Sequence, residues 1–312
     1  MSDFVHMTLH AFQASGLLLA GITPVYFNRN ITEEERRERA YNGALFVYGA
    51  LKGTQKIVAW AQELIEQTFS DVADVRTAHI HLEKQDFVDR AGPLKSKFTN
   101  DPKTKQLCQE FITSIGADPE RTYFDLPRLR VIPPSNFLTA GVSYNYAPHR
   151  DTWYAHPRQL INYWIPVYDT ESTTVMTMFI DQFGKPVENN SGKWDYDDWV
   201  KNARYSAAQN VEKEERSHPL PVGDVFNSTN LRLVLNAADT MIFSTCQLHA
   251  STPNETDGIR FSYDLRTLNL DDLLNERGPE NVDGRATGST LRDFLRVSDL
   301  EPLEIEKHHA AS

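Results

Sequence analysis

The sequence predicts a single β-rich domain, a sandwich or a barrel, that is supported by helices. Its 312 residues, 40% of them hydrophobic, are enough to bury a sizeable core. Residues 1–127 have a mixed, largely helical pattern. From residue 128 the apolar runs become short, alternating and rich in Val, Ile, Tyr, Phe and Thr. We therefore expect helical support over 1–127, a strand-rich core over 128–270 and a C-terminal extension over 271–312.

Spacing and end signals predict two helices in the support region. In residues 54–69 the large apolar side chains recur at helical spacing. Farther along, Asn100 or Asp101 can cap a helix that has Pro102 in its first turn and Gly116 just past its end.

Three other segments of this region have simpler interpretations. Residues 31–53 are polar and then helical, and the helix should stop at Gly53. His79 and His81 have metal-like spacing without an evident partner carboxylate, so we interpret them as neighbours on one face of a strand. The apolar run 16–27 is too short to cross a bilayer and should be buried. No Lys or Arg precedes it, which argues against a signal peptide.

Composition excludes several classes of function. The net charge of −11 makes the chain a poor non-specific ligand for nucleic acid, because binding phosphates requires Lys and Arg. Cys108 and Cys246 lack zinc-site spacing, and two cysteines do not suggest a disulfide scaffold. We expect a cytoplasmic protein with reduced thiols and no transmembrane segment. Peripheral contact with membrane lipid and the oligomeric state stay open.

Four alternating apolar runs are expected to be strands: residues 159–169, 173–181, 231–245 and 258–270. Between the second and the third lies a long polar segment, 183–224, with a partly helical pattern. A structureless loop of this length is unusual inside a compact domain. We therefore interpret it as an insertion between strands, with a lid as one role for it.

The stretch APHRDTWYAHP, residues 147–157, contains His149 and Asp151 two positions apart. Such a pair alone is usually a surface turn. A third residue of metal-ligand type, His249, follows an apolar strand far down the chain. On the next strand Arg260, Ser262, Asp264 and Arg266 share one face, because side chains alternate along a strand. That face is either solvated or the inside of a polar pocket.

His149, Asp151 and His249 match a two-histidine, one-carboxylate facial triad, which leaves positions on Fe(II) open for a co-substrate and O₂. A fixed arginine on the strand after the distal histidine can bind a carboxylate through two hydrogen bonds. Arg260 has that position, and Ser262 can donate a further hydrogen bond. The alternatives are chance and a degenerate barrel that no longer binds iron.

These motifs resemble the Fe(II)- and 2-oxoglutarate-dependent dioxygenases, most closely their phytanoyl-CoA-hydroxylase-like branch. The resemblance covers roughly residues 128–268 and consists of HRD at 149–151, NYWIPVYD at 162–169, HASTPN at 249–254, and Arg260. In that branch Ser or Thr follows the distal histidine by two residues and the 2-oxoglutarate arginine follows it by eleven. Here these are Ser251 and Arg260. The chain departs from the branch in its long span from Asp151 to His249 and in lacking a Gly-rich run before His249.

The resemblance implies a double-stranded β-helix, a squashed barrel of two sheets with iron at its open end. It implies Fe(II) on the triad, 2-oxoglutarate and O₂ as co-substrates, and Arg260 beneath the far carboxylate of 2-oxoglutarate. The other residues assigned to this pocket are Ser262, Ser251, Asn162 and Trp164, although core packing explains Trp164 equally well. Hydroxylation of a C–H bond is the implied reaction, since the family's halogenases replace the Asp151 ligand by Gly or Ala.

A local excess of arginines suggests a small, polar, anionic substrate. Between residues 128 and 168 the only acid is Asp151, and such a basic region concentrates anions. The alternative is that these arginines pair with acids from elsewhere in the fold. The candidate substrate residues are Arg128, Arg130, Tyr146, Trp153 and Arg158, with core packing as the alternative for Tyr146. The stretch SYNYAPHRDTWYAHP, residues 143–157, resembles enzymes that hydroxylate the lipopolysaccharide sugar Kdo.

Other functions stay open from the sequence. A free amino acid, an acyl-CoA or a natural-product intermediate could be the substrate of a hydroxylase of this kind. A cupin-like metal enzyme without 2-oxoglutarate and a non-catalytic β-sandwich binding module come from other classes. The pairing of Arg260 with Ser262 argues against the former, and the intact triad argues against the latter.

Overall fold

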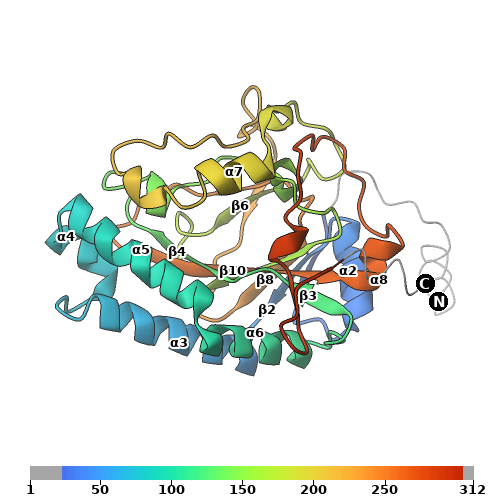
Figure 1. Ribbon diagram of the computed structural model, residues 1–312, viewed down its shortest axis with the longest axis horizontal. Helices are drawn as coiled ribbons and strands as arrows, with labels where there is room; N and C mark the ends of the chain where they lie inside the picture. Colours follow the sequence, from blue (N-terminus) through green and yellow to red (C-terminus); the bar gives the residue numbers. More distant parts are fainter. Residues whose placement is uncertain (1–22, 305–312) are drawn as a thin grey trace, which may run out of the picture.

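The computed structural model describes residues 23–304 (Figure 1). Most of the apolar run 16–27 lies outside the described residues, and its last three residues form a strand. The helices are α2 (Glu33–Tyr41), α3 (Lys52–Thr68), α4 (Ala78–His81), α5 (Lys84–Asn100), α6 (Pro102–Ser114), α7 (Tyr196–Asn202) and α8 (Leu270–Leu274). Helices α3, α5 and α6 lie together on one side of the strands, whereas α7 lies on the other (Figure 1).

Both helices predicted in the support region, one from apolar spacing and one from end signals, are present. The backbone N–H of Lys103 donates to the Asp101 carboxylate at 2.8 Å, which caps α6, and Gly116 follows the helix with a φ of 91° that favours glycine. The prediction for residues 31–53 is wrong in its second half. That segment continues from α2 into a strand, and Gly53 lies in the first turn of α3. A Cβ on Gly53 would meet the Phe111 backbone at 2.9 Å, so glycine permits the close packing of α3 on α6.

The prediction of a strand at His79 and His81 is also wrong. Both residues lie in the short helix α4, where positions two apart point in different directions. They therefore do not face a common partner, and His79 packs edge-on against Phe137 instead.

The strands form a large sheet and a small one. The large sheet has the order β1 (Val25–Phe27), β2 (Leu45–Tyr48), β8 (Thr240–Ser244), β5 (Ile161–Pro166), β10 (Arg260–Asn269), β3 (Thr122–Phe124) and β11 (Leu295–Arg296), and β4 (Arg128–Ile132) also pairs with β10. The small sheet is β7 (Asn230–Arg232), β6 (Met176–Phe179) and β9 (His249–Ser251). Each of the four predicted runs contains a strand, and run 231–245 divides into β7 and β8. The large sheet extends beyond the predicted core limits 128–270 at both ends.

The large sheet presents one apolar face to the helices, whereas its face toward the small sheet is polar along β10 and apolar around Trp164, Met241 and Phe243. Tyr163 and Ile165 on β5, and Tyr263 and Leu265 on β10, belong to the core cluster that includes α3, α5 and α6. The alternating residues of β10 face the other way; Arg260, Ser262 and Arg266 are buried, with Arg260 only 6% exposed, and Asp264 is partly buried. This decides between the two interpretations of that face: it is the inside of a pocket. Two sheets that enclose a polar interior make the predicted double-stranded β-helix core.

The insertion 183–224 is an ordered part of the fold. It contains α7 and short 3₁₀ turns, and it crosses the side of the small sheet that is remote from α3 (Figure 1). Its residues Trp194, Tyr196 and Trp199 line the main cavity, so the insertion forms one of the cavity's walls.

Candidate active site

Backbone pairing brings the two histidines of the triad together. The N–H of His149 donates to the carbonyl of His249 at 2.9 Å, and the N–H of His249 donates to the carbonyl of His149 at 3.0 Å. The two residues thus form a directly hydrogen-bonded antiparallel pair at the edge of β9. Their rings lie side by side, with centroids 4.4 Å apart.

Asp151 completes the cluster from the start of a 3₁₀ turn, Asp151–Tyr154. Its Oδ1 lies 3.5 Å from Nε2 of His149 and 3.9 Å from Nε2 of His249. One ligand atom from each of the three side chains lies within 4.8 Å of the others, and all three residues are buried. The predicted triad residues are therefore brought together.

The hydrogen bonds of the rings fix which nitrogen faces the cluster. Nδ1 of His149 lies 2.8 Å from the Ala147 carbonyl, and Nδ1 of His249 lies 2.8 Å from the Gln247 carbonyl. A carbonyl can only accept, so each Nδ1 carries the proton and each Nε2 of a neutral ring offers a lone pair. Two lone pairs then face a carboxylate oxygen, an arrangement that repels itself unless a cation lies between them.

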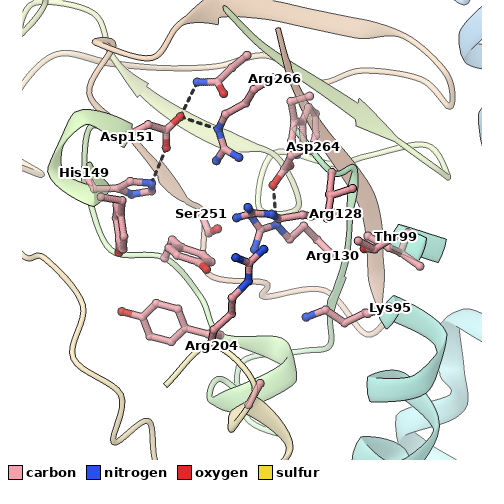
Figure 2. A pocket seen from close by; sticks show the side chains of 18 of the residues that line it. Lys95, Thr99, Arg128, Arg130, His149, Asp151, Arg204, Ser251, Asp264 and Arg266 are labelled. Atoms are coloured by element: carbon pink, nitrogen blue, oxygen red, sulfur yellow. Dashed lines mark hydrogen bonds and ion pairs between the residues drawn. The ribbon is translucent and has the colours of Figure 1, made fainter. Parts of the chain in front are cut away.

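The second oxygen of Asp151 is held from behind. Oδ2 accepts from Nδ2 of Asn162 at 2.7 Å and from Nε of Arg266 at 3.2 Å (Figure 2). Burial alone would raise the pKa of Asp151, but Arg266 and the histidines hold that pKa well below its usual range. Burial together with His149 lowers the pKa of His249 to about 4. Two neutral imidazoles and one ionised carboxylate are the protonation states that a metal requires, so the residues fit a divalent ion such as Fe(II).

Arg260 is a buried cation without an ion pair to any acid of residues 23–304. Its only hydrogen bond, from Nη1 to the Val175 carbonyl, is long at 3.5 Å, and its Nε is buried without a partner among residues 23–304. Burial lowers the pKa of Arg260 to about 10. The Oγ of Ser262, two residues along the same face, is likewise buried without a partner in the described chain. Orphaned buried donors are uncommon in folded proteins, and Arg260 lines the cavity, so its guanidinium can accept an anionic ligand, whereas Ser262 is not among the residues that line it.

The other residues predicted for the 2-oxoglutarate pocket are close by. Ser251 and Trp164 line the same cavity as Arg260 and the triad, and Trp164 also packs in the core cluster behind it. Asn162 lines the cavity too, but its amide is engaged by Asp151.

The cavity measures about 390 Å³, within the range of small-molecule sites. The triad and Arg260 line one part of it. Aromatic side chains line another: Tyr144, Tyr146, Tyr154, Trp194, Tyr196, Trp199 and Tyr205. There was little indication in the sequence that most of these aromatic residues line the cavity, because they lie in the insertion and in irregular segments around His149, where no strand or helix periodicity shows which way a side chain points.

Of the predicted substrate residues, Arg128, Arg130 and Tyr146 line the cavity. Arg130 donates to Asp264 at 2.5 Å, and its guanidinium lies 4.9 Å from the centre of the Tyr146 ring. Arg128 is the freer of the two arginines, with its closest acid, Asp125, 3.8 Å away.

The predictions for Trp153 and Arg158 require correction, because neither residue lines the cavity. The 3₁₀ turn after Asp151 directs Trp153 into a hydrophobic cluster with Phe179 and Leu248, where its indole N–H donates to Asp283. Arg158 donates to the carbonyls of Pro279 and Glu276, which attaches the C-terminal extension. Both residues therefore have structural roles.

Three charged side chains of the cavity were missed by sequence reasoning, and one of them is Arg216 of the insertion. Lys95 comes from α5 and Arg204 from the insertion, and both point into the cavity across from His149 and Asp151 (Figure 2). Nothing in the pattern around either residue distinguishes it from a solvent-exposed helix residue.

No family model and no curated protein matches the chain. Solved structures with a similar fold do exist. EvdO2 from Micromonospora carbonacea var. aurantiaca, solved with 2-oxoglutarate, has 15% identity and a TM-score of 0.45 over 77% of this chain and 92% of that one. The epimerase SnoN, solved with Fe³⁺, α-ketoglutarate and nogalamycin RO, has 12% identity and a TM-score of 0.40 over 75% and 83%. The non-haem monooxygenase ThoJ has 16% identity and a TM-score of 0.37 over 71% and 72%.

Because their TM-scores are below 0.5, these similar structures assign no function to this chain. Any functional assignment has to rest on the side chains of its own site. Within residues 23–304 no helix combines the length and the hydropathy that crossing a membrane requires.

Proposed function

We propose that this protein is a non-haem Fe(II)- and 2-oxoglutarate-dependent dioxygenase that hydroxylates a C–H bond of a small molecule. One observation carries the proposal: a buried triad, whose Nδ1 atoms are directed at backbone carbonyls, shares a cavity with Arg260, a buried guanidinium that has no acid among residues 23–304. A metal site alone would fit many enzymes. An additional unpaired cation at the base of the same cavity fits a co-substrate with a carboxylate at its far end.

His149, Asp151 and His249 would hold the iron. With 2-oxoglutarate and O₂ bound, iron supplies the oxidising power that puts one oxygen atom into a C–H bond, while the other oxygen atom enters succinate as 2-oxoglutarate loses CO₂. Arg260 binds the far carboxylate through its guanidinium fork, and the Ser262 hydroxyl donates to the same group. Arg266 and Asn162 orient Asp151 and keep it ionised, a role that outer residues have at most metal sites.

The substrate proposed from the sequence is a polar anion, with the sugar acid Kdo as one specific candidate. Arg128 and Tyr146 in the cavity are compatible with this proposal, and Trp153 and Arg158 no longer contribute to it. Free amino acids, acyl-CoAs and natural-product intermediates also carry suitable anionic groups.

The test is to reconstitute the protein with Fe(II) without oxygen and then supply 2-oxoglutarate, O₂ and a panel of these compounds. Succinate release should be coupled to a product that gains one oxygen atom. A product of unchanged mass would replace hydroxylation by epimerisation, and one that loses two hydrogens would replace it by desaturation or ring closure. Turnover that needs no 2-oxoglutarate would contradict the proposal.

A further inference from the structure

The charges of the cavity divide into paired and unpaired cations. Arg130 pairs with Asp264 at 2.5 Å, Arg204 with Asp293 at 2.9 Å, and Arg216 with Glu214 at 2.7 Å. Arg266 is shared by Asp125 and Asp151. Of the other lining cations, Arg260 and Lys95 have no ion pair with an acid of residues 23–304, and Arg128 has only a long one, with Asp125 at 3.8 Å.

Lys95 and Arg128 are separate from the Arg260 site. Lys95 Nζ donates to the Val142 carbonyl and forms no ion pair with any carboxylate of residues 23–304, which leaves two of its N–H groups free. Arg128 lies 3.8 Å from Asp125, whose same oxygen already accepts from Arg266 at 2.9 Å. In Figure 2 both side chains extend into the cavity on the side away from His149.

The charges around Lys95 are mostly positive. Burial lowers its pKa to about 7, and Arg130, Arg216 and Arg128 contribute in the same direction, whereas Asp264 opposes them. A partly buried ammonium whose charged neighbours are mostly guanidinium groups is unfavourable unless an anion accompanies it. A monoanion would balance the charge of Lys95 and leave Arg128 with only its long contact to an oxygen of Asp125 that Arg266 also uses.

An aromatic side chain connects this basic group to the triad. The Tyr146 ring lies 5.5 Å from the His149 ring on one side and 4.9 Å from the Arg130 guanidinium on the other. Tyr144 packs edge-on against Tyr146 at 4.8 Å, and Trp199 lines the facing part of the insertion. Aromatic faces of this kind bind the apolar faces of flat or sugar rings.

We infer that Lys95 and Arg128 form a subsite for a dianionic phosphate or sulfate ester, and that the ester's ring lies on Tyr146 between that subsite and the triad. The inference rests on the proposed function and adds a substrate class to it. Holding the charged end of the substrate fixes which carbon faces the metal. Lys95, which comes from a helix outside the strand-rich core, thus becomes a specificity-determining residue.

The experiment is calorimetric titration of the full chain with sodium sulfate, phenyl phosphate, methyl phosphate and acetate. The variants are Lys95→Met and Arg128→Met, with Lys97→Met as the control, because Lys97 is an exposed lysine of the same helix. Sulfate should bind at least tenfold more tightly than acetate. Each of the two test variants should weaken sulfate binding at least tenfold, and Lys97→Met should stay within twofold. Unfolding temperatures show that each variant is folded, and Lys95→Arg should retain binding.

Arg260→Met separates this inference from the proposed function. It should abolish 2-oxoglutarate binding and leave sulfate binding within twofold. Lys95→Met should weaken sulfate binding and leave 2-oxoglutarate binding within twofold. Failure of 2-oxoglutarate to bind the unaltered protein would overturn the proposed function and leave the sulfate result standing. Equal affinity for acetate and sulfate, or sulfate binding that is indifferent to Lys95 and Arg128, would overturn the inference. Equal affinity for phenyl and methyl phosphate would overturn the placement of a ring on Tyr146.

Discussion

Strand β10 carries a buried arginine near each of its ends, and the two differ in whether acidic side chains pair with the guanidinium. Near one end Arg266 donates to Asp125 at 2.9 Å and to Asp151 at 3.2 Å. Near the other end, the one hydrogen-bond partner of Arg260 in the described part of the chain is the Val175 carbonyl, at 3.5 Å. Both side chains are almost fully buried, with relative exposures of 7% and 6%.

Burial lowers the pKa of both guanidinium groups, but at Arg266 the two carboxylates outweigh it and raise the pKa, whereas at Arg260 it falls to about 10. Leaving a buried charge unpaired costs several kcal/mol. The contrast therefore separates a cation that positions a metal ligand from a cation whose partner is a ligand of the protein. Four changes to the chain test this contrast.

The largest effect is expected at the group that Arg266 positions. Asp151→Ala removes the anionic ligand, so Fe(II) binding should be lost and turnover should fall at least a hundredfold, on the order of the loss expected for a ligand that also orients the site. His149→Ala and His249→Ala should behave alike, and His79→Ala, in α4, should be silent. Metal content after dialysis against Fe(II) measures this. Full activity in Asp151→Ala would refute the triad.

Arg266→Met should affect stability most. It leaves Asp125 and Asp151 buried without their cation, and breaking a buried pair in this way costs about 3–5 kcal/mol. Urea unfolding gives the free energy. The control is Arg76→Met, because Arg76 forms an exposed ion pair with Asp74 whose loss should cost less than about 1 kcal/mol. Equal losses in the two variants would show that Arg266 is not the structural cation described here.

Arg260→Met should change stability in the opposite direction. Removing an unpaired buried charge should raise the free energy of unfolding by about 1 kcal/mol when 2-oxoglutarate is absent. Adding 2-oxoglutarate should then stabilise the unaltered protein and leave the variant unchanged, because only a ligand that binds the folded state shifts the equilibrium. A variant that is strongly destabilised would mean that Arg260 has a partner inside the fold.

The smallest effect concerns Lys95. Its pKa is about 7 in the folded protein, below the ordinary value of 10.5, so between these values the unfolded chain holds a proton that the folded protein has released. Stability should therefore rise with pH from 7 towards 10.5. The rise should be smaller in Lys95→Met, which lacks the group. Thermal unfolding at pH 6 and pH 9 measures the difference. Identical pH dependence in the two proteins would mean that the Lys95 amine is solvated and that its pKa is not lowered.

Much of the inner site could be predicted because it depends on strand alternation. Arg260 and Ser262 share a face of β10 by the period of two, and a histidine at a strand end can reach a His-x-Asp turn. The sequence could not indicate that residues 45–48 form a strand, because apolar residues that follow a helical stretch fit either state until β8 supplies a partner.

The outer site was less predictable because it depends on tertiary placement. Arg158 was assigned to the substrate from the local excess of arginines and Trp153 from the stretch 143–157, but the 3₁₀ turn that starts at Asp151 directs the chain away from the cavity. Lys95 could not be assigned to the site from the sequence, for the converse reason. It is remote in sequence, and only the packing of α5 beside β4 brings it to the site.

Anaerobic titration of Fe(II) and then 2-oxoglutarate, followed by the metal-to-ligand charge-transfer absorption, tests the central claim most directly. The unaltered protein should develop the band only when both are present, with one Fe(II) and one 2-oxoglutarate per chain. Arg260→Met should bind Fe(II) normally and require at least a hundredfold more 2-oxoglutarate, and Arg260→Lys should recover part of the loss because an ammonium does not reproduce the fork. A band of full intensity at unchanged 2-oxoglutarate concentration in Arg260→Met would contradict the account.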